Sequence, residues 1–423
     1  MAAQITREDD DSIVIELTFS KHSSFLQAEE QIQDQLNQAG RLATERCLAD
    51  FDSDGSPMMV GNTKLTAKKQ RVEKKYESPF GAIRVQRYAY QSPAGGATFI
   101  PLEARARIIG NSTPRFAKLV ASKYSHSNAG VVQRDLLESL HRKVSRCYIQ
   151  DVSALVAEGI EAKSRVWETG GEEPPADEVA TIGIGLDGVS MLFCEDGYRQ
   201  AMVGTIAFYD CGGNRLHTHY VAAAPEHGKS VFLERMDHEI ARVKGRYAHA
   251  RYVGVSDGAS DFRPWLQKHT TTRVLDFWHL TEYLAEASKA MFRRTAEREE
   301  WMDDRCHHLK HGHGAAAEIL GEIEAALDQP GLSAAKRGTL ETTARYMRNN
   351  LKRTNYASYR KSHLPIGSGI TEAACKSVVK QRMCGSGMKW KFSGAETVLT
   401  LRSKTLTKGA WEVFWAQVAK FGL

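Results

Sequence analysis

The sequence has no long hydrophobic run, no internal repeat and no low-complexity tract. No apolar stretch approaches the roughly 18 uninterrupted residues that a membrane-spanning helix needs, and no apolar segment typical of a signal peptide is found. We therefore expect a globular protein without a membrane segment. Its 423 residues exceed the usual size of one domain, which predicts two or three domains.

Cysteine is scarce, and its seven occurrences follow no pattern. Their number is odd, they are dispersed along the chain, and no two of them form a C-x-x-C pair. This usage argues against a secreted disulfide framework and favours a reduced, cytoplasmic protein.

Neither sign of charge dominates. Lys and Arg total 57 and Asp and Glu total 51, for a net charge of +6. So mild an excess permits binding to a polyanion but does not establish it.

The N-terminal part predicts a helix followed by a basic hairpin. Residues 22–50 place apolar side chains at helical intervals among Glu and Gln, which indicates an amphipathic helix. A Lys-rich stretch at residues 64–75 leads into residues 76–88, where Pro and Gly separate two alternating segments typical of a hairpin. The charge fits a solvated surface and a DNA contact equally well.

Residues 114–163 predict three short helices separated by tight turns, an arrangement typical of a helix-turn-helix. The third helix would begin after Ser145, whose hydroxyl suits an N-cap. Arg146 and Gln150 would then be free to contact base edges or phosphates. Most three-helix clusters are ordinary packing units, so this interpretation depends on the domain that follows.

After the turn-rich acidic residues 170–178 the pattern changes to strands. Three strand-like runs joined by turns predict an antiparallel meander, and a helix, a strand, a second helix and a last strand follow. This order matches an RNase H-like sheet, in which the first and fourth strands are neighbours. The runs are residues 179–193, 199–209, 216–224, 228–244, 251–257, 261–268 and 273–276.

Two of these strands end in an Asp-Gly pair, at Asp187 and at Asp257. Neighbouring strands would bring both carboxylates together, where each repels the other unless a cation holds them. Their oxygen ligands suit Mg²⁺ or Mn²⁺, and two such ions can activate a nucleophile and stabilise the leaving oxygen in phosphoryl transfer. A single Asp-Gly is usually only a turn, but two pairs at these strand ends favour catalysis.

A third motif, Pro-Ile-Gly-Ser-Gly-Ile-Thr-Glu, begins at residue 365 and ends at Glu372. Its glycines permit a backbone that opens a helix, and the N-terminal amides of a helix favour a phosphate. Lys376 and Lys380 recur four and eight residues after Glu372, where they would suit a DNA strand. The alternative is a ladder of salt bridges along the helix.

Together these sequence motifs resemble those of the bacterial insertion-sequence DDE transposases, in particular the ISKra group. More distantly they resemble the Mutator-like lineage, which has an Asp-x-x-His signature. The resemblance covers most of the chain. It implies that Asp187, Asp257 and Glu372 are the catalytic and metal-binding acids. The Asp-x-x-His signature falls on Asp276 and His279. His279 then orients a phosphate or Asp276, or it closes the corner between strand and helix as a structural histidine.

The resemblance implies metal-dependent cleavage at transposon ends and strand transfer into target DNA, with two Mg²⁺ or Mn²⁺ ions. The expected partner is double-stranded DNA, bound by a homodimer or larger assembly in the bacterial cytoplasm at the nucleoid. Further DNA contacts are expected from Arg382, Lys389 and Trp390. Two alternatives stay open: an RNase H-fold nuclease that does not join DNA, and a domesticated DNA-binding regulator without catalysis.

The interval between Asp257 and Glu372 is longer than a minimal RNase H-like core needs, and its pattern predicts an all-α insertion. Cys306, His307, His308, His311 and His313 lie in this insertion; their spacing matches no closed zinc module, so a polar loop is the simpler interpretation. The expected fold is α/β, with an RNase H-like core of five mixed strands interrupted by the insertion and preceded by a mainly helical DNA-binding region. The predicted divisions are residues 1–110 (helix and basic hairpin), 111–169 (helix-turn-helix), 170–178 (linker), 179–282 (core, first part), 283–360 (insertion) and 361–423 (core, last part, with C-terminal helices).

Overall fold

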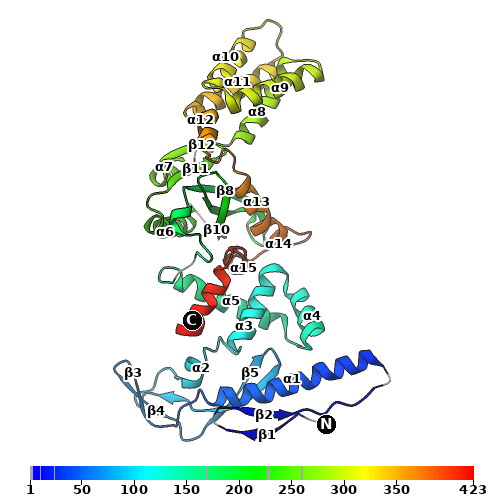
Figure 1. Ribbon diagram of the computed structural model, residues 1–423, viewed down its shortest axis with the longest axis vertical. Coiled ribbons are helices and arrows are strands. Elements are labelled where there is room, and N and C mark those ends of the chain that lie inside the picture. Colours follow the sequence, from blue (N-terminus) through cyan, green and yellow to red (C-terminus); the bar gives the residue numbers. More distant parts are fainter. Residues whose placement is uncertain (1–2, 10, 23, 168–169, 226–228, 259–260) are drawn as a thin grey trace. The chain divides into compact units, whose positions relative to one another are not determined.

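The computed structural model describes residues 3–9, 11–22, 24–167, 170–225, 229–258 and 261–423 (Figure 1). The chain divides into two compact units. The boundary between Gly171 and Glu172 falls within the predicted linker, whereas the last two helices, which the sequence placed with the core, pack in unit 1. Unit 1 comprises Met1–Gly171, Ser393–Thr405 and Gly409–Leu423, and unit 2 comprises Glu172–Phe392 and Leu406–Lys408.

Unit 1 contains the predicted long helix, α1 (Phe25–Ala49), and the predicted hairpin, and the helix lies against the hairpin. The hairpin strands β5 (Val72–Ser78) and β6 (Gly81–Arg87) pair antiparallel over their whole length. Gly40 of α1 allows the hairpin turn to approach, because a Cβ there would lie 2.3 Å from the ring of Phe80. The remaining elements of this part are β1 (Gln4–Glu8), β2 (Ile13–Glu16), β3 (Met58–Val60), β4 (Thr63–Ala67), β7 (Tyr90–Gln91) and α2 (Pro101–Arg105).

The predicted group of short helices is present in unit 1. Ser145 caps the third of them, since its Oγ accepts a hydrogen bond from the amide of Tyr148 at 3.1 Å. The two C-terminal helices pack on this group, and the buried Arg402 donates to the carbonyl oxygen of Ser125 at 2.7 Å. These contacts explain why the end of the chain belongs to unit 1. The helices are α3 (Pro114–His126), α4 (Ala129–Leu140), α5 (Arg146–Lys163), α15 (Phe392–Leu406) and α16 (Ala410–Phe421).

Unit 2 contains a mixed five-stranded sheet with the order β10-β9-β8-β11-β12. The first three strands along the chain form the predicted antiparallel meander, and β11 pairs parallel with both β8 and β12. The prediction that the first and fourth strands are neighbours is therefore confirmed. The strands are β8 (Thr181–Phe193), β9 (Gly197–Tyr209), β10 (Arg215–Ala223), β11 (Arg251–Ser256) and β12 (Thr272–Leu275), and a short 3-10 helix, η1 (Ala176–Glu178), precedes them.

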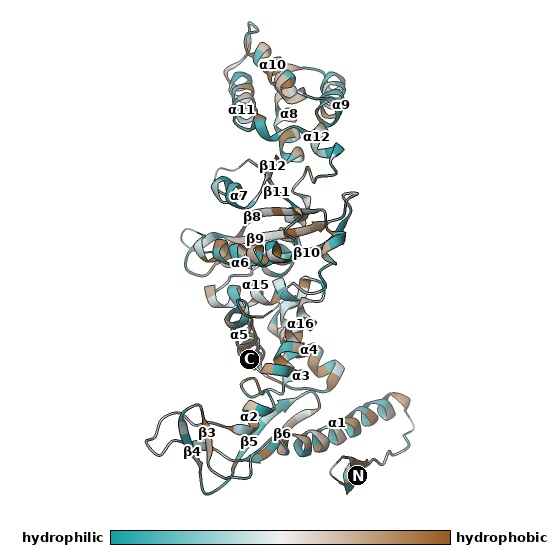
Figure 2. Cartoon of the chain, turned by 60° about the vertical axis from the view of Figure 1, so that its left-hand side comes forward, coloured by the Kyte–Doolittle hydropathy of each residue, from teal (hydrophilic) through white to brown (hydrophobic). Residues whose placement is uncertain are grey.

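The two faces of β8 have different neighbours. Ile182, Ile184 and Leu186 alternate along the strand and pack with helices α6 (Ser230–Arg246) and α7 (Arg263–His269). Helix α6 carries both hydrophobic and hydrophilic residues (Figure 2), and its buried apolar side chains recur every three or four positions, as in an amphipathic helix that packs on a sheet. The opposite face of β8 presents Gly183, Gly185 and Asp187, because successive side chains of a strand point to opposite sides.

Helices fill the interval between β12 and the segment that carries Glu372. Their buried side chains form one hydrophobic cluster with residues of β11 and β12. The chain breaks between α8 and α9, and α9 extends to His311, through most of the residues that the sequence analysis interpreted as a polar loop. Only Trp301 and Leu309 of α9 are buried, so its apolar spacing is weak. The helices are α8 (Phe277–Met291), α9 (Thr295–His311), α10 (Ala315–Leu327), α11 (Ala334–Asn350), η2 (Leu351–Arg353) and α12 (Tyr356–Lys361).

Three short segments complete unit 2: α13 (Gly369–Ala374), the π-helix η3 (Cys375–Lys380) and α14 (Gln381–Met383). The π-turn widens the helix after Glu372, so the even spacing expected for Lys376 and Lys380 on one α-helical face is not kept. Within the described ranges, none of the helices combines the length and the apolar character needed to cross a bilayer.

Candidate active site

The pairing of β8 with β11 relates the first two predicted acids. Arg251 pairs with Thr181, and the same register continues to Val255 and Gly185. If this register is extended by two residues, Asp257 is the position opposite Asp187. Asp187 still belongs to β8, and Asp257 follows the last residue of β11. Because side chains alternate along a strand, Asp187 belongs to the face that presents Gly183 and Gly185, and Asp257 follows the end of the neighbouring strand.

Helix α13 lies on this face of β8. A Cβ at Gly185 would be 2.0 Å from Oγ1 of Thr371, so the glycine makes the approach of the helix possible. Thr371 Oγ1 also lies 2.8 Å from Oγ1 of Thr205 on β9, in a buried hydrogen bond. These contacts set the position of the next residue, Glu372, above the strand that carries Asp187.

Cys375 links Asp187 and Glu372 electrostatically. Its thiol donates to Oδ2 of Asp187 at 3.4 Å, while Oδ1 of Asp187 accepts the amide of Gly188 at 2.7 Å. Burial raises the pKa of the Cys375 thiol, and the negative charges of Asp187 and Glu372 raise it further. Asp187 therefore contacts the buried sulfur atom directly, and Cys375 lies three residues along the chain from Glu372.

Asp257 is exposed and lies beside Tyr346 of α11. The Tyr346 hydroxyl donates to the backbone carbonyl of Asp257 at 2.5 Å. Burial raises the pKa of Tyr346, and the neighbouring Tyr283, Asp257 and Asp276 contribute to the increase. Tyr346 thus anchors the end of β11 to the helical region.

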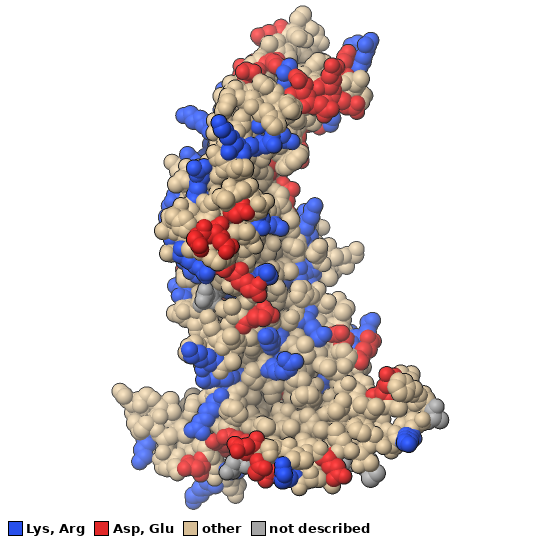
Figure 3. Space-filling view, viewed as in Figure 1, with Lys and Arg blue, Asp and Glu red and all other residues tan. Residues whose placement is uncertain are grey.

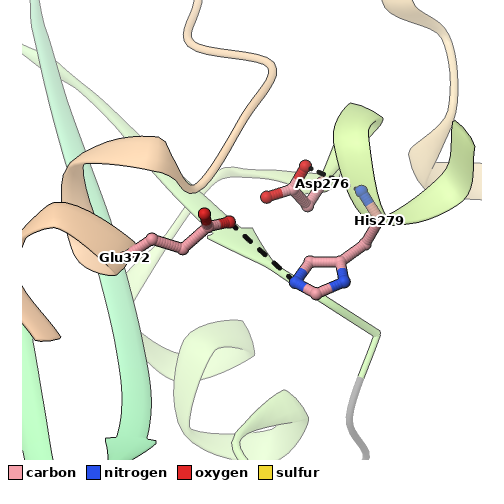
Figure 4. A group of neighbouring side chains, drawn as sticks. All are labelled: Asp276, His279 and Glu372. Atoms are coloured by element: carbon pink, nitrogen blue, oxygen red, sulfur yellow. Dashed lines mark hydrogen bonds and ion pairs between the residues drawn. The ribbon is translucent and has the colours of Figure 1, made fainter. Parts of the chain in front are cut away.

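Asp276, His279 and Glu372 form the tightest group of potential ligands found among the described residues (Figure 4). One ligand atom from each lies within 4.8 Å of the others. His279 Nε2 is 4.0 Å from Glu372 Oε1, and Figure 4 shows the imidazole turned toward that carboxylate. Asp187 and Asp257 do not belong to this group. The structure therefore brings the Asp-x-x-His signature together with Glu372.

Asp276 is poorly suited to bind a metal ion, because its oxygens already accept hydrogen bonds. It is completely buried. Its Oδ1 accepts the amides of Trp278 at 2.6 Å and His279 at 3.3 Å, which caps α8. Its Oδ2 accepts both the amide of Ser368, at 2.7 Å, and the Ser368 hydroxyl. Asp276 is thus a positioning residue that ties the start of α8 to the loop before α13.

Ser368 connects this carboxylate to Glu372. Its Oγ contacts Oδ2 of Asp276 and lies 2.9 Å from Oε1 of Glu372. A hydroxyl has one hydrogen to donate, so it can satisfy only one of the two carboxylates at a time. The sequence did not single out Ser368, although it lies inside the Gly-Ser-Gly string. Thr371, Cys375 and Tyr346 were also missed, because nothing in their local sequence marks them.

Two arginines converge near the end of β11. Arg263 donates to Oδ1 of Asn350 at 3.4 Å, and Arg353 donates to the same oxygen. Arg353 also donates to the Ser256 hydroxyl at 3.1 Å. Burial lowers the pKa of Arg353, and the positive charges of Arg263 and Arg273 lower it further. No carboxylate of the described residues pairs with these two guanidinium groups. They place positive charge beside the residue that precedes Asp257.

The residues predicted to contact DNA have different environments. Arg382 is buried, 4% exposed, and lies over the ring of Trp390, whose indole Nε1–H donates to the carbonyl of Met383 at 2.8 Å. The backbone of Trp390 also pairs with that of Leu192. Arg382 and Trp390 therefore serve packing in this structure. The other predicted contacts, Arg146, Gln150, Lys376, Lys380 and Lys389, are exposed.

The Cys and His residues of the helical region do not converge as zinc ligands. His308 contacts Glu318 at 2.7 Å and His311 contacts Arg360 at 2.8 Å. Cys306 is partly buried, and this burial raises the pKa of its thiol. In the part of the chain that the structure describes, these side chains form no group of three close ligand atoms.

Comparison with protein-family models gave no match to the chain, and a search of curated proteins gave none either.

Proposed function

We propose that the chain is a metal-dependent DDE transposase with an RNase H-like core, in which Asp187, Asp257 and Glu372 are the catalytic acids. One observation carries the proposal. The register of β8 and β11 relates Asp187 to Asp257 across neighbouring parallel strands, and Glu372 follows a helix start that contacts β8 through Gly185. Neighbouring strands lie roughly 4.8 Å apart, so acids at equivalent positions can share a cation.

The strand order supports the proposed core. A meander of three antiparallel strands with a fourth strand parallel to the first, and a fifth beside it, is the order expected of an RNase H-like sheet. The acids come from β8, from the end of β11 and from α13, although all three lie far apart in the sequence. The helices between β12 and α13 correspond to the proposed insertion.

The three acids fit a hard divalent cation better than the group of Asp276, His279 and Glu372 does. They supply carboxylate oxygens alone, which Mg²⁺ and Mn²⁺ prefer, whereas the second group contains an imidazole and a carboxylate whose oxygens are already hydrogen-bonded. When bound between Asp187, Asp257 and Glu372, such cations make a water or a 3′-hydroxyl more nucleophilic and stabilise the leaving oxygen.

The chain's own residues then hold these acids in place. Ser368 and the buried Asp276 restrain Glu372 at the start of α13, and the amide of Gly188 orients the Asp187 carboxylate. His279 lies near Glu372 with its ring 36% exposed, where it can contact a DNA phosphate. Arg263 and Arg353 add positive charge at the end of β11.

The test uses DNA from both sides of the coding region, searched for inverted repeats and offered as labelled duplex ends with Mg²⁺ or Mn²⁺. Asp187→Ala, Asp257→Ala and Glu372→Ala should each reduce cleavage by at least about 100-fold. Glu195→Ala, which removes an exposed acid between β8 and β9, is the matched control and should cleave normally. Normal cleavage by the three variants would contradict the proposal.

Strand-transfer products on a supercoiled target distinguish a transposase from a nuclease that only cuts. Binding of the ends without any metal-dependent cleavage would instead indicate a DNA-binding regulator.

A further inference from the structure

Unit 2 contains a cationic cavity of about 600 Å³ outside the group of acids. Among the described residues that line it there is no Asp or Glu, and Lys, Arg and His make up half of them. The lining residues are Gly212, Gly213, Lys310, His311, Ala357, Arg360, Lys361, His363, Leu364 and Ile366.

Two helix ends build the cationic wall. Lys310 and His311 lie in the last turn of α9, and Arg360 and Lys361 lie in the last turn of α12. Cations are favoured at these positions because the C-terminal end of a helix carries partial negative charge. The chain then turns at His363 in the left-handed region, with φ of 54°, and closes the cavity toward Leu364.

These cations are not neutralised by acids. Among the described residues, no carboxylate forms an ion pair with Lys310, Arg360 or Lys361. Arg360 instead donates to Nε2 of His311 at 2.8 Å, which requires that nitrogen to be unprotonated. Desolvation and the charge of Arg360 lower the pKa of His311, in agreement with this contact. The cavity thus gathers like charges, and an anion would relieve their repulsion.

The cavity leads toward the candidate active site. Ile366 lines it, and the carbonyl of Ile366 accepts the amide of Phe277 at 2.9 Å. The Lys310 ammonium lies 4.7 Å from the ring centre of Phe277 and 5.1 Å from that of Trp278. The cavity is therefore contiguous with the loop that precedes Glu372.

Trp278 is the exposed aromatic residue at this junction. It is 58% exposed although it is large and apolar, and it lies two residues after the buried Asp276. Its ring packs against Gly367, where a Cβ would lie 3.0 Å from Trp278 Cδ1. A flat ring presented beside a cationic pocket is typical of proteins that stack bases while they bind phosphates.

We propose that this cavity binds backbone phosphates of a DNA strand and that Trp278 stacks on one of its bases, so that the strand is led to Glu372. Arg360 supplies a planar fork that matches a phosphate, and Lys310 and Lys361 supply point charges. Lys and Arg side chains gather over the part of unit 2 where α12 and α8 lie (Figure 3). The identity of the strand as transposon DNA rests on the proposed function, but the binding itself does not.

The test measures binding of a fluorescein-labelled single strand and of a duplex to the full chain by anisotropy, without divalent ions and at several salt concentrations. Arg360→Gln/Lys361→Gln should bind at least about tenfold more weakly and lose about one to two units of the slope of log affinity against log salt. Trp278→Ala should weaken binding of the single strand more than that of the duplex. Lys336→Gln/Arg337→Gln, which removes two cations from α11, is the matched control and should bind like the parent.

Arg360→Lys/Lys361→Arg keeps the charges and should restore binding, which separates a phosphate site from a structural role. Equal affinity and equal salt slope for the parent and the glutamine variant would overturn the proposal, and so would a failure of the charge-conserving variant to bind. Glu372→Ala should still bind the strand. Loss of cleavage with intact binding therefore reports on the acids, and loss of binding with intact acids reports on the cavity.

Discussion

Asp276 holds Ser368 through two hydrogen bonds, one from the Ser368 amide at 2.7 Å and one from its hydroxyl, and both reach the same carboxylate oxygen. The other oxygen of Asp276 caps α8. One buried side chain thus joins a helix start that follows β12 to the loop that precedes Glu372. This relationship gives the Asp-x-x-His signature a role that its sequence does not reveal, because Asp276 positions Glu372 through Ser368.

Asp276→Asn should separate the two functions of this side chain. The Asn carbonyl can still cap α8, but its NH₂ group would face the amide donor of Ser368. The free energy of unfolding should fall by about 1–3 kcal/mol, as for a buried donor left without an acceptor. Urea denaturation measures this change, and cleavage should fall although Asp187, Asp257 and Glu372 are intact.

Ser368→Ala is the control for Asp276→Asn. It removes the hydroxyl but keeps the amide hydrogen bond, so the loss should be smaller, about 0.5–1.5 kcal/mol. If Asp276→Asn were as stable as the parent and only weakened Mn²⁺ binding, Asp276 would be a ligand and the positioning role would be wrong.

Gly185→Ala should displace α13 from β8. The added Cβ would lie 2.0 Å from Thr371 Oγ1, in a buried contact that cannot open without moving the helix. We expect a loss of about 1–3 kcal/mol in the free energy of unfolding, typical of overpacking, together with loss of cleavage. Gly369→Ala is the matched control, since nothing lies within 4 Å of its added Cβ. Comparable stability of the two variants would show that α13 does not depend on this close approach.

Cys375 should react slowly with iodoacetamide. Burial and the charges of Asp187 and Glu372 raise the pKa of its thiol, and the thiolate is the reactive form. Asp187→Asn removes one negative charge, lowers that pKa and should speed alkylation at a fixed pH near 8, which mass spectrometry of the labelled peptide measures. The exposed Cys47 of unit 1 is the internal control and should react at the same rate in both proteins.

If alkylation of Cys375 were unchanged by Asp187→Asn, the two side chains would not interact in solution as they do here. The contact between β8 and the π-helix would then need revision.

Unit 2 should lose stability in alkaline solution through Tyr209. Burial raises the pKa of Tyr209 to about 12, against 10.0 for a free tyrosine. The unfolded chain therefore releases this proton first, so the contribution to stability is complete below pH 10 and is lost as the pH rises toward 12. Between these two pH values the parent should lose more unfolding free energy than Tyr209→Phe does. The difference should be on the order of 2 kcal/mol.

Tyr198→Phe is the control for Tyr209→Phe, because Tyr198 is 74% exposed. It should leave the alkaline slope unchanged. An equal slope in the parent and in Tyr209→Phe would mean that Tyr209 is not buried in solution.

Local sequence was sufficient to predict many of the elements. The alternation of Ile182, Ile184 and Leu186 marks β8, and Ser145 marks the start of α5, because hydrophobic spacing and helix caps depend on residues a few positions away. It was insufficient for α9, whose charged surface leaves few apolar residues to reveal its period. That β8 and β11 are neighbours followed from the expected strand order, since few topologies suit such a pattern.

The sequence by itself determined the order of the strands and placed Asp187 in the first of them and Asp257 directly after the fourth. Only the tertiary structure decided that Asp276 is saturated with hydrogen bonds, that Arg382 is buried against Trp390, and that the last helices pack in unit 1. The physical reason is that burial and hydrogen bonding depend on partners far away along the chain. A carboxylate or a guanidinium has the same letter in the sequence whether it faces solvent or the interior.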